Sequence, residues 1–82
     1  MPDTIHFTLH NNYSNDLMVG VYDTYGGVDR QTWTGPLNKD ESTSIEVYAN
    51  SDGRGNARWE SVGGPAGSGS DINDGDTCEV NP

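Results

Sequence analysis

Cysteine and basic residues are scarce in this chain of 82 residues. With Cys78 as its single cysteine, the chain can form no intramolecular disulfide, so a disulfide-stapled secreted scaffold is excluded. We expect Cys78 to be a small strand residue, with a disulfide-linked dimer as the alternative. Four basic residues stand against thirteen acidic ones, for a formal net charge of −9. Nucleic acids and anionic membranes attract basic surfaces, so we expect neither as a partner.

Long apolar runs are also missing. No stretch approaches the roughly 20 apolar residues of a membrane-spanning helix, which predicts no membrane insertion. Met1-Pro2-Asp3 leads directly into a strand pattern, without the basic region and apolar run of a secretory leader. This start favours a location inside the cell, unless a signal has been removed.

The few apolar residues follow a two-residue period. Leu, Ile, Val and Phe together fall below the roughly 20% at which disorder becomes a serious alternative. The pattern nevertheless favours folding, because these residues alternate with polar ones in three runs: Ile5, Phe7 and Leu9; Leu17, Val19 and Val21; Ile45, Val47 and Ala49. Such alternation between turn-rich segments is typical of half-buried β-strands.

The pattern predicts about six strands, over 4–10, 17–24, 30–34, 43–49, 56–62 and 77–80. Gly35-Pro36 is expected to break the chain, and Leu37 to plug the end of the core. Segment 63–70 is rich in Gly, Pro and Ser and is expected to be a flexible crossing loop. We predict one domain over 1–82, an all-β antiparallel β-sandwich or small open barrel.

Several blocks of the sequence are similar to one known family. An I-x-F-x-L-x-N-N strand over 5–12 precedes L-M-V-G-V-Y over 17–22, and 37–47 then reads L-N-K-D-E-S-T-S-I-E-V. After a Gly-bearing turn comes N-A-R-W over 56–59. This order resembles the N-terminal half of thaumatin-like proteins, without their disulfides and with Asp40 where the family commonly has Gly. The resemblance implies an antiparallel sandwich and a binding or defence-type role, and it carries over no site residue.

The acidic segment 71–76 is the strongest candidate for metal chemistry. Calcium prefers oxygen ligands, and Asp71, Asn73, Asp74 and Asp76 could supply several. The spacing departs from the EF-hand pattern, because Gly75 stands where an oxygen side chain is needed. We therefore expect an acidic turn before an edge strand, with a calcium loop as the alternative and no other cofactor.

Two other groups of side chains fall on the polar faces of the strands. His6 and His10 are separated by four strand residues, or about 13 Å, which is too far for one metal ion, so they are expected to face solvent. Tyr22 and Tyr48 lie opposite their strands' apolar residues, and Tyr25 lies beside a turn. Such tyrosines could bind a sugar or a protein, or could simply pack.

No spacing signature of a catalytic site is present, so we expect a non-enzymatic protein. The first hypothesis is a protein-binding or self-associating module, which could form a homo-oligomer through edge strands at the termini. Two alternatives stay open: a carbohydrate-binding, lectin-like module, and a calcium-binding structural domain of crystallin type.

Overall fold

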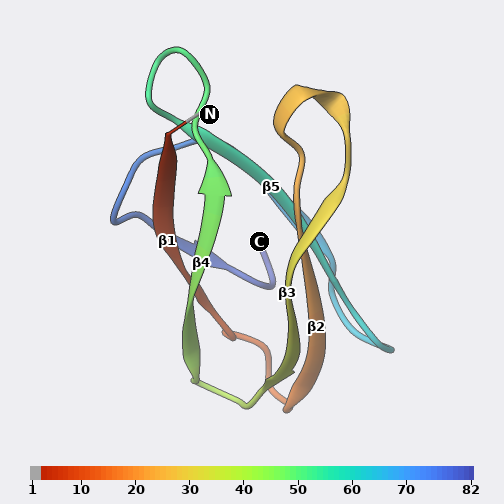
Figure 1. Ribbon diagram of the computed structural model, residues 1–82. Coiled ribbons are helices and arrows are strands. Elements are labelled where there is room, and N and C mark those ends of the chain that lie inside the picture. Colours follow the sequence, from red (N-terminus) through yellow and green to blue (C-terminus); the bar gives the residue numbers. More distant parts are fainter. Residues whose placement is uncertain (1–2) are drawn as a thin grey trace.

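Seven β-strands in two sheets make up the fold in the computed structural model, which describes residues 3–82 (Figure 1). The smaller sheet has the order β4 (Ser42–Tyr48), β1 (Thr4–His10) and β7 (Thr77–Glu79). The larger sheet has the order β3 (Arg30–Leu37), β2 (Leu17–Asp23), β5 (Gly55–Ser61) and β6 (Gly67–Ile72). A 3-10 turn, η1 (Tyr25–Gly27), links β2 to β3. The expected leaderless start rests partly on Met1 and Pro2, which lie outside the described residues.

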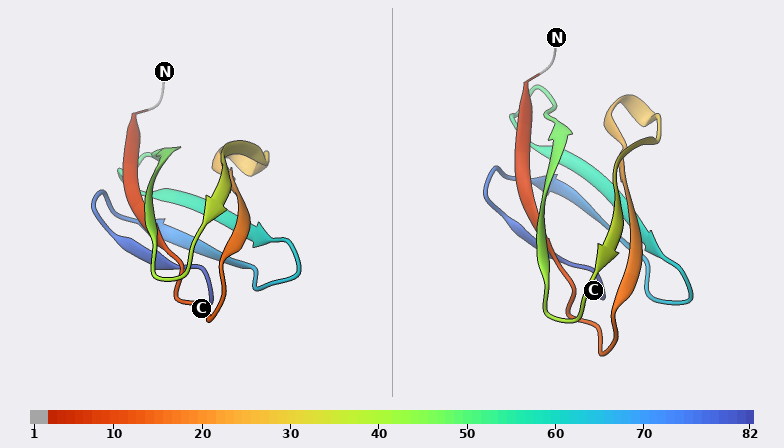
Figure 2. Two further views of the ribbon diagram at one scale, coloured as in Figure 1. Left: turned by 90° about the horizontal axis from the view of Figure 1, so that it is seen from below. Right: turned by 60° about the horizontal axis from the view of Figure 1, so that its bottom comes forward.

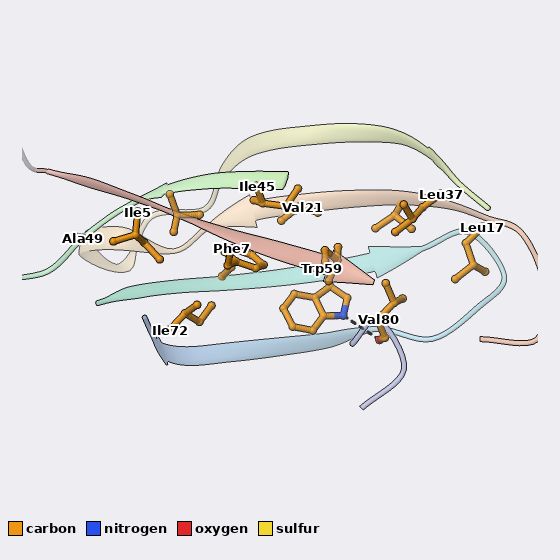
Figure 3. Close-up of a cluster of buried hydrophobic side chains, with 14 residues drawn as sticks. Ile5, Phe7, Leu17, Val21, Leu37, Ile45, Ala49, Trp59, Ile72 and Val80 are labelled. Atoms are coloured by element: carbon orange, nitrogen blue, oxygen red, sulfur yellow. Dashed lines mark hydrogen bonds between the residues drawn. The ribbon is translucent and has the colours of Figure 1, made fainter. Parts of the chain in front are cut away.

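The predicted all-β sandwich is confirmed, and within residues 3–82 the sheets do not close into a barrel. Two further views show β5 and β6 running together past β1 and β4 (Figure 2). The alternating residues of β1, β2, β4 and β5 turn one set of side chains inward, and these fill the space between the sheets (Figure 3). The buried apolar residues are Ile5, Phe7, Leu9, Leu17, Val19, Val21, Leu37, Ile45, Val47, Ala49, Ala57, Trp59, Ile72 and Val80.

The third strand is longer than the sequence predicts. Gly35-Pro36 does not end the strand, because β3 continues to Leu37. As expected, Leu37 is buried at the end of the core. Pro36 pairs with Met18 on β2, and β3 lies at the edge of its sheet. Proline lacks a backbone N–H, and an edge strand tolerates this because only one of its sides must be paired.

The expectation of a structureless loop over 63–70 is wrong for its second half, where β6 begins at Gly67. Glycine allows a close approach here. A Cβ on Gly67 would lie 3.0 Å from Nε1 of Trp59 and 3.1 Å from Cγ of Pro82. The same Nε1 donates a hydrogen bond of 2.9 Å to the carbonyl of Val80, drawn as a dashed line in Figure 3. The glycines were interpreted as loop residues, whereas strand glycines also mark such close packing.

The strands nearest the termini differ from the expected pair of edges. β1 is the central strand of the smaller sheet, with β4 antiparallel on one side and β7 parallel on the other. Of these two strands β7 alone lies at an edge of its sheet, and its parallel pairing with β1 departs from the predicted antiparallel arrangement. Strand alternation does not reveal this order, because it gives the face of each residue and not the neighbour of each strand.

Asp23 is a buried carboxylate that ties the two sheets together, and it is only 1% exposed. Its Oδ2 accepts hydrogen bonds from Nη2 of Arg30 at 2.6 Å and from the backbone N–H of Tyr48 at 2.9 Å. Its Oδ1 accepts the N–H of Tyr25 at 3.0 Å. Tyr48 belongs to the smaller sheet, whereas Asp23 and Arg30 belong to the larger one. A single side chain therefore joins β4, η1 and β3 to β2.

Asn11 has a comparable role just beyond β1, where it is fully buried. Its Nδ2 donates to the carbonyls of Leu37 at 2.8 Å and Asn15 at 3.0 Å, and its Oδ1 accepts the N–H of Tyr13. Within the described chain, no buried side-chain nitrogen or oxygen lacks a hydrogen-bond partner. The thin apolar core is thus supplemented by polar side chains whose bonds are satisfied.

We expect Asp23→Ala to lower the free energy of unfolding by about 2–4 kcal/mol, because it leaves two backbone N–H groups and Arg30 without their acceptor. Asp52→Ala makes the same chemical change at an exposed position of the β4–β5 loop and should cost less than about 0.5 kcal/mol. Urea unfolding followed by circular dichroism measures both. Equal stability of the two variants would contradict the role given to Asp23.

Candidate functional site

The acidic segment forms the turn that precedes β7. Two of its carboxylates accept backbone N–H groups: Oδ1 of Asp74 from His6 at 2.9 Å, and Oδ2 of Asp76 from Asn73 at 2.9 Å. The N–H of Gly75 also donates to the carbonyl of His6 at 2.8 Å. The turn is therefore attached to β1 through His6, both by a backbone hydrogen bond and by the carboxylate of Asp74.

Asp71 lies apart from these bonds, at the end of β6. It has a φ of 54°, and its N–H donates to Oδ1 of Asn56 at 3.3 Å. Among residues 3–82, no cluster of three or more His, Cys, Asp or Glu side chains has the arrangement of a metal site. The calcium loop expected from Asp71, Asn73, Asp74 and Asp76 stays a prediction, with Asp74 and Asp76 already engaged in the turn.

Asp76→Ala separates the structural turn from a calcium loop. Loss of the bond to Asn73 should lower the free energy of unfolding by about 1 kcal/mol, and by the same amount in calcium and in chelator. Thermal melts of the natural protein and the variant under both conditions provide the measurement. A melting temperature that rises with calcium in the natural protein but not in the variant would support the calcium loop instead.

The histidines lie on the outer face of the smaller sheet, each beside a carboxylate from a neighbouring strand. Nε2 of His6 lies 3.2 Å from Oε2 of Glu46 on β4, and Nδ1 of His10 lies 2.6 Å from Oε2 of Glu79 on β7. Each histidine therefore pairs with a carboxylate across a different strand boundary.

Tyr48 and Tyr25 are brought together, and Arg30 lies with them. The two rings meet edge to face with centroids 5.6 Å apart, and the guanidinium carbon of Arg30 lies 4.2 Å from the centroid of Tyr48. The same Arg30 forms the ion pair with buried Asp23. These tyrosines are consequently held in place at the point where η1 meets the smaller sheet.

Tyr22 belongs to a different cluster, on the outer face of the larger sheet. The guanidinium carbon of Arg58 lies 4.1 Å from the centroid of its ring, and its hydroxyl donates to Oε1 of Glu60 at 3.4 Å. Nε of Arg58 donates to Asp29 at 2.8 Å, which raises the pKa of Arg58 above its usual value, and the charges of Asp29 and Glu60 add to this effect. Tyr22 and Tyr48 thus belong to different sheets and contact different arginines.

A groove lies on the outer face of the larger sheet, where the sequence pattern did not predict one. It consists of two adjoining hollows of about 390 and 340 Å³ that share Met18 and Val62. We call it the β2 groove and define it by Asp16, Met18, Gly20, Pro36, Glu60 and Val62. Met18 is 53% exposed and Val62 is 83% exposed. The alternation could have found both, since each is apolar at a position whose parity points away from the core: Met18 on β2, and Val62 in the turn just after β5.

Gly20 leaves the middle of the β2 groove open. It lies on β2 between Thr34 of β3 and Glu60 of β5, where other residues of the same face carry side chains. A Cβ there would contact Nε2 of Gln31 at 3.4 Å and Cε2 of Tyr22 at 3.7 Å, which are ordinary packing distances. The glycine is therefore not required by crowding, and its consequence is the open floor between Met18 and Tyr22.

No family model, curated protein or solved structure matches this chain. The resemblance to thaumatin-like proteins stays a prediction. Asp40, which stands where that family commonly has Gly, has a φ of 65°, a left-handed backbone conformation that glycine favours and Asp tolerates. Within the described residues, no helix has the length and apolar character needed to span a bilayer.

Cys78 is a half-buried free thiol on β7. Burial, followed by the nearby charges of Asp76 and Glu79, raises the pKa of the Cys78 thiol above its ordinary value. Because the thiolate is the nucleophile, the raised pKa lowers the reactivity of the thiol at neutral pH. This placement agrees with the expected small strand residue.

We expect alkylation of Cys78 by iodoacetamide to be slower than that of a model cysteine peptide and to rise with pH at higher values. Unfolding in urea should restore the peptide's profile, because burial is then lost. Rates measured by mass spectrometry across the alkaline range test this expectation. A folded protein that reacts as fast as the peptide at neutral pH would contradict it.

Proposed function

We propose that this protein is a non-enzymatic binding module that recognises another protein through the β2 groove. The observation that carries the proposal is the pair of exposed apolar side chains, Met18 and Val62, at the junction of the two hollows. Exposed apolar side chains gathered in one patch are typical of protein-binding surfaces. Met18 is suited to such contact, because its flexible thioether adapts to different partners.

The arrangement of the aromatic rings favours protein over carbohydrate. A sugar ring stacks on an open aromatic face, but the rings of Tyr22 and Tyr48 each have a guanidinium over one face, at 4.1 and 4.2 Å from the centroid. Tyr25 presents its ring to Tyr48. These tyrosine rings are therefore engaged in contacts within the fold and are weaker candidates for a lectin site.

A selection from a library of displayed peptides tests the proposed function. Selected peptides should lose binding by tenfold or more when Met18 and Val62 are both replaced by serine, because the apolar contact is removed without adding bulk. The matched control is Thr8→Ser with Ser44→Thr on the outer face of the smaller sheet, which should leave binding unchanged.

Selected peptides that bind the serine variant as well as the natural protein would contradict the proposal. A thermal-shift panel of simple sugars checks the alternative on the same samples. A sugar that raises the melting temperature, with no loss in the Met18/Val62 variant, would favour the carbohydrate module instead.

A further inference from the structure

We propose that the β2 groove binds an extended cationic segment of a partner protein, in which two basic side chains flank an apolar one. This inference rests on the proposed function and specifies the chemistry of the partner.

The groove follows β2, with its apolar part in the middle. Met18 pairs with Pro36 across to β3, and the N–H of Val62 donates to the carbonyl of Met18 at 3.1 Å. These three apolar side chains lie between Asp16 at one end and Glu60, which pairs with Gly20, at the other. From Asp16 to Gly20 the chain advances four residues, or about 13 Å.

The partner must be recognised through its side chains. β2 lies between β3 and β5 and is hydrogen-bonded to both, so its backbone offers no free edge at this face. Association by pairing at a strand edge, which the sequence analysis expected only at the termini, is therefore not available in the β2 groove. An extended segment lying over the groove would turn alternate side chains, at i, i+2 and i+4, toward the sheet.

Both ends of the groove are net negative after neighbouring cations are counted. At one end Asp29 and Glu60 stand against Arg58, with contacts of 2.8 and 3.6 Å, which leaves a formal charge of −1. At the other end Asp16 accepts the N–H of Lys39, and the same turn carries Asp40 and Glu41, which leaves −2. Two basic side chains about 13 Å apart complement this distribution.

A second copy of the chain fits the groove less well than a basic partner. Each copy has a formal net charge of −9, so two copies repel each other over distance. Two of the four basic residues are also paired with carboxylates of their own chain, Arg30 with Asp23 and Arg58 with Asp29. The chain thus has little free positive charge to offer to its own groove.

The probe is a fluorescein-labelled peptide containing Lys-Ser-Leu-Ser-Lys, which places both lysines and the leucine on one face when extended. Three control peptides change one property each. Lys-Lys-Leu-Ser-Ser keeps the composition but loses the spacing, Lys-Ser-Ser-Ser-Lys loses the apolar side chain, and Glu-Ser-Leu-Ser-Glu reverses the charge. Fluorescence anisotropy at physiological ionic strength should show the first peptide binding at least about tenfold more tightly than each control.

Two charge variants distinguish the groove from the overall charge. Asp16→Asn with Glu60→Gln keeps the shape and the hydrogen-bond acceptors, and it should weaken binding of the probe about tenfold. Asp52→Asn with Asp71→Asn changes the net charge by the same amount on exposed residues away from the groove, and binding should change less than about twofold. Circular dichroism confirms that each variant is folded.

The outcomes separate this inference from the proposed function. Equal weakening by both charge variants, or equal binding of the charge-reversed peptide, would overturn the cationic partner. Library peptides that lack basic residues yet lose binding to the Met18/Val62 serine variant would overturn it too, while leaving the proposed function intact. If the Met18/Val62 variant binds every peptide as the natural protein does, both proposals fail together.

Discussion

The buried carboxylate of Asp23 is the interaction on which the arrangement of the two sheets depends. A carboxylate removed from water is costly unless charge and hydrogen bonds replace its hydration. Here Arg30 and the backbone N–H groups of Tyr25 and Tyr48 supply these contacts. The donors come from η1, β3 and β4. The hydrogen bonds of the Asp23 carboxylate therefore fix the positions of these three segments relative to β2. A core this small gains from such a restraint, since its apolar side chains alone define the packing only loosely.

The same restraint explains why the aromatic cluster and the β2 groove differ in character. Near Asp23, the rings of Tyr25 and Tyr48 contact each other, and Arg30 lies over the ring of Tyr48. The side chains at this end of β2 are therefore engaged in contacts within the protein. Nearer the start of β2 the outward-facing residues are Met18 and Gly20. Met18 exposes apolar surface, and Gly20 leaves the floor of the groove open. The two ends of β2 thus have different roles. Asp23 at its end stabilises the packing of the two sheets, and Met18 near its start contributes to the proposed binding surface.

The period of two placed the core residues and the outward faces correctly, because side-chain parity is a local property of a strand. It did not reveal β6, whose glycines carry no apolar signal, nor the central position of β1, which depends on pairing between distant segments. Asp23 and Asn11 could have been recognised, since both continue the inward parity of an apolar run with a polar residue. Conversely, Met18 and Val62 could have been recognised as apolar residues at positions where the alternation expects polar, outward-facing ones. The alternation could not predict that Tyr22 and Tyr48 have different surroundings, because these depend on the order of the strands in the sheets.

The pairing of β1 with both β4 and β7 also governs how the chain reaches this state. Thr8 pairs with Thr77, and Thr4 with Tyr48, so neither partner of the central strand is a neighbour in sequence. Closing such long loops is entropically expensive before any contact forms, and domains dominated by distant pairings fold slowly. On the ribosome, β1 emerges early and waits with one side unpaired until β7 is made. The smaller sheet is therefore complete only once β7 has been made, and until then the β7 side of β1 is an unpaired strand edge.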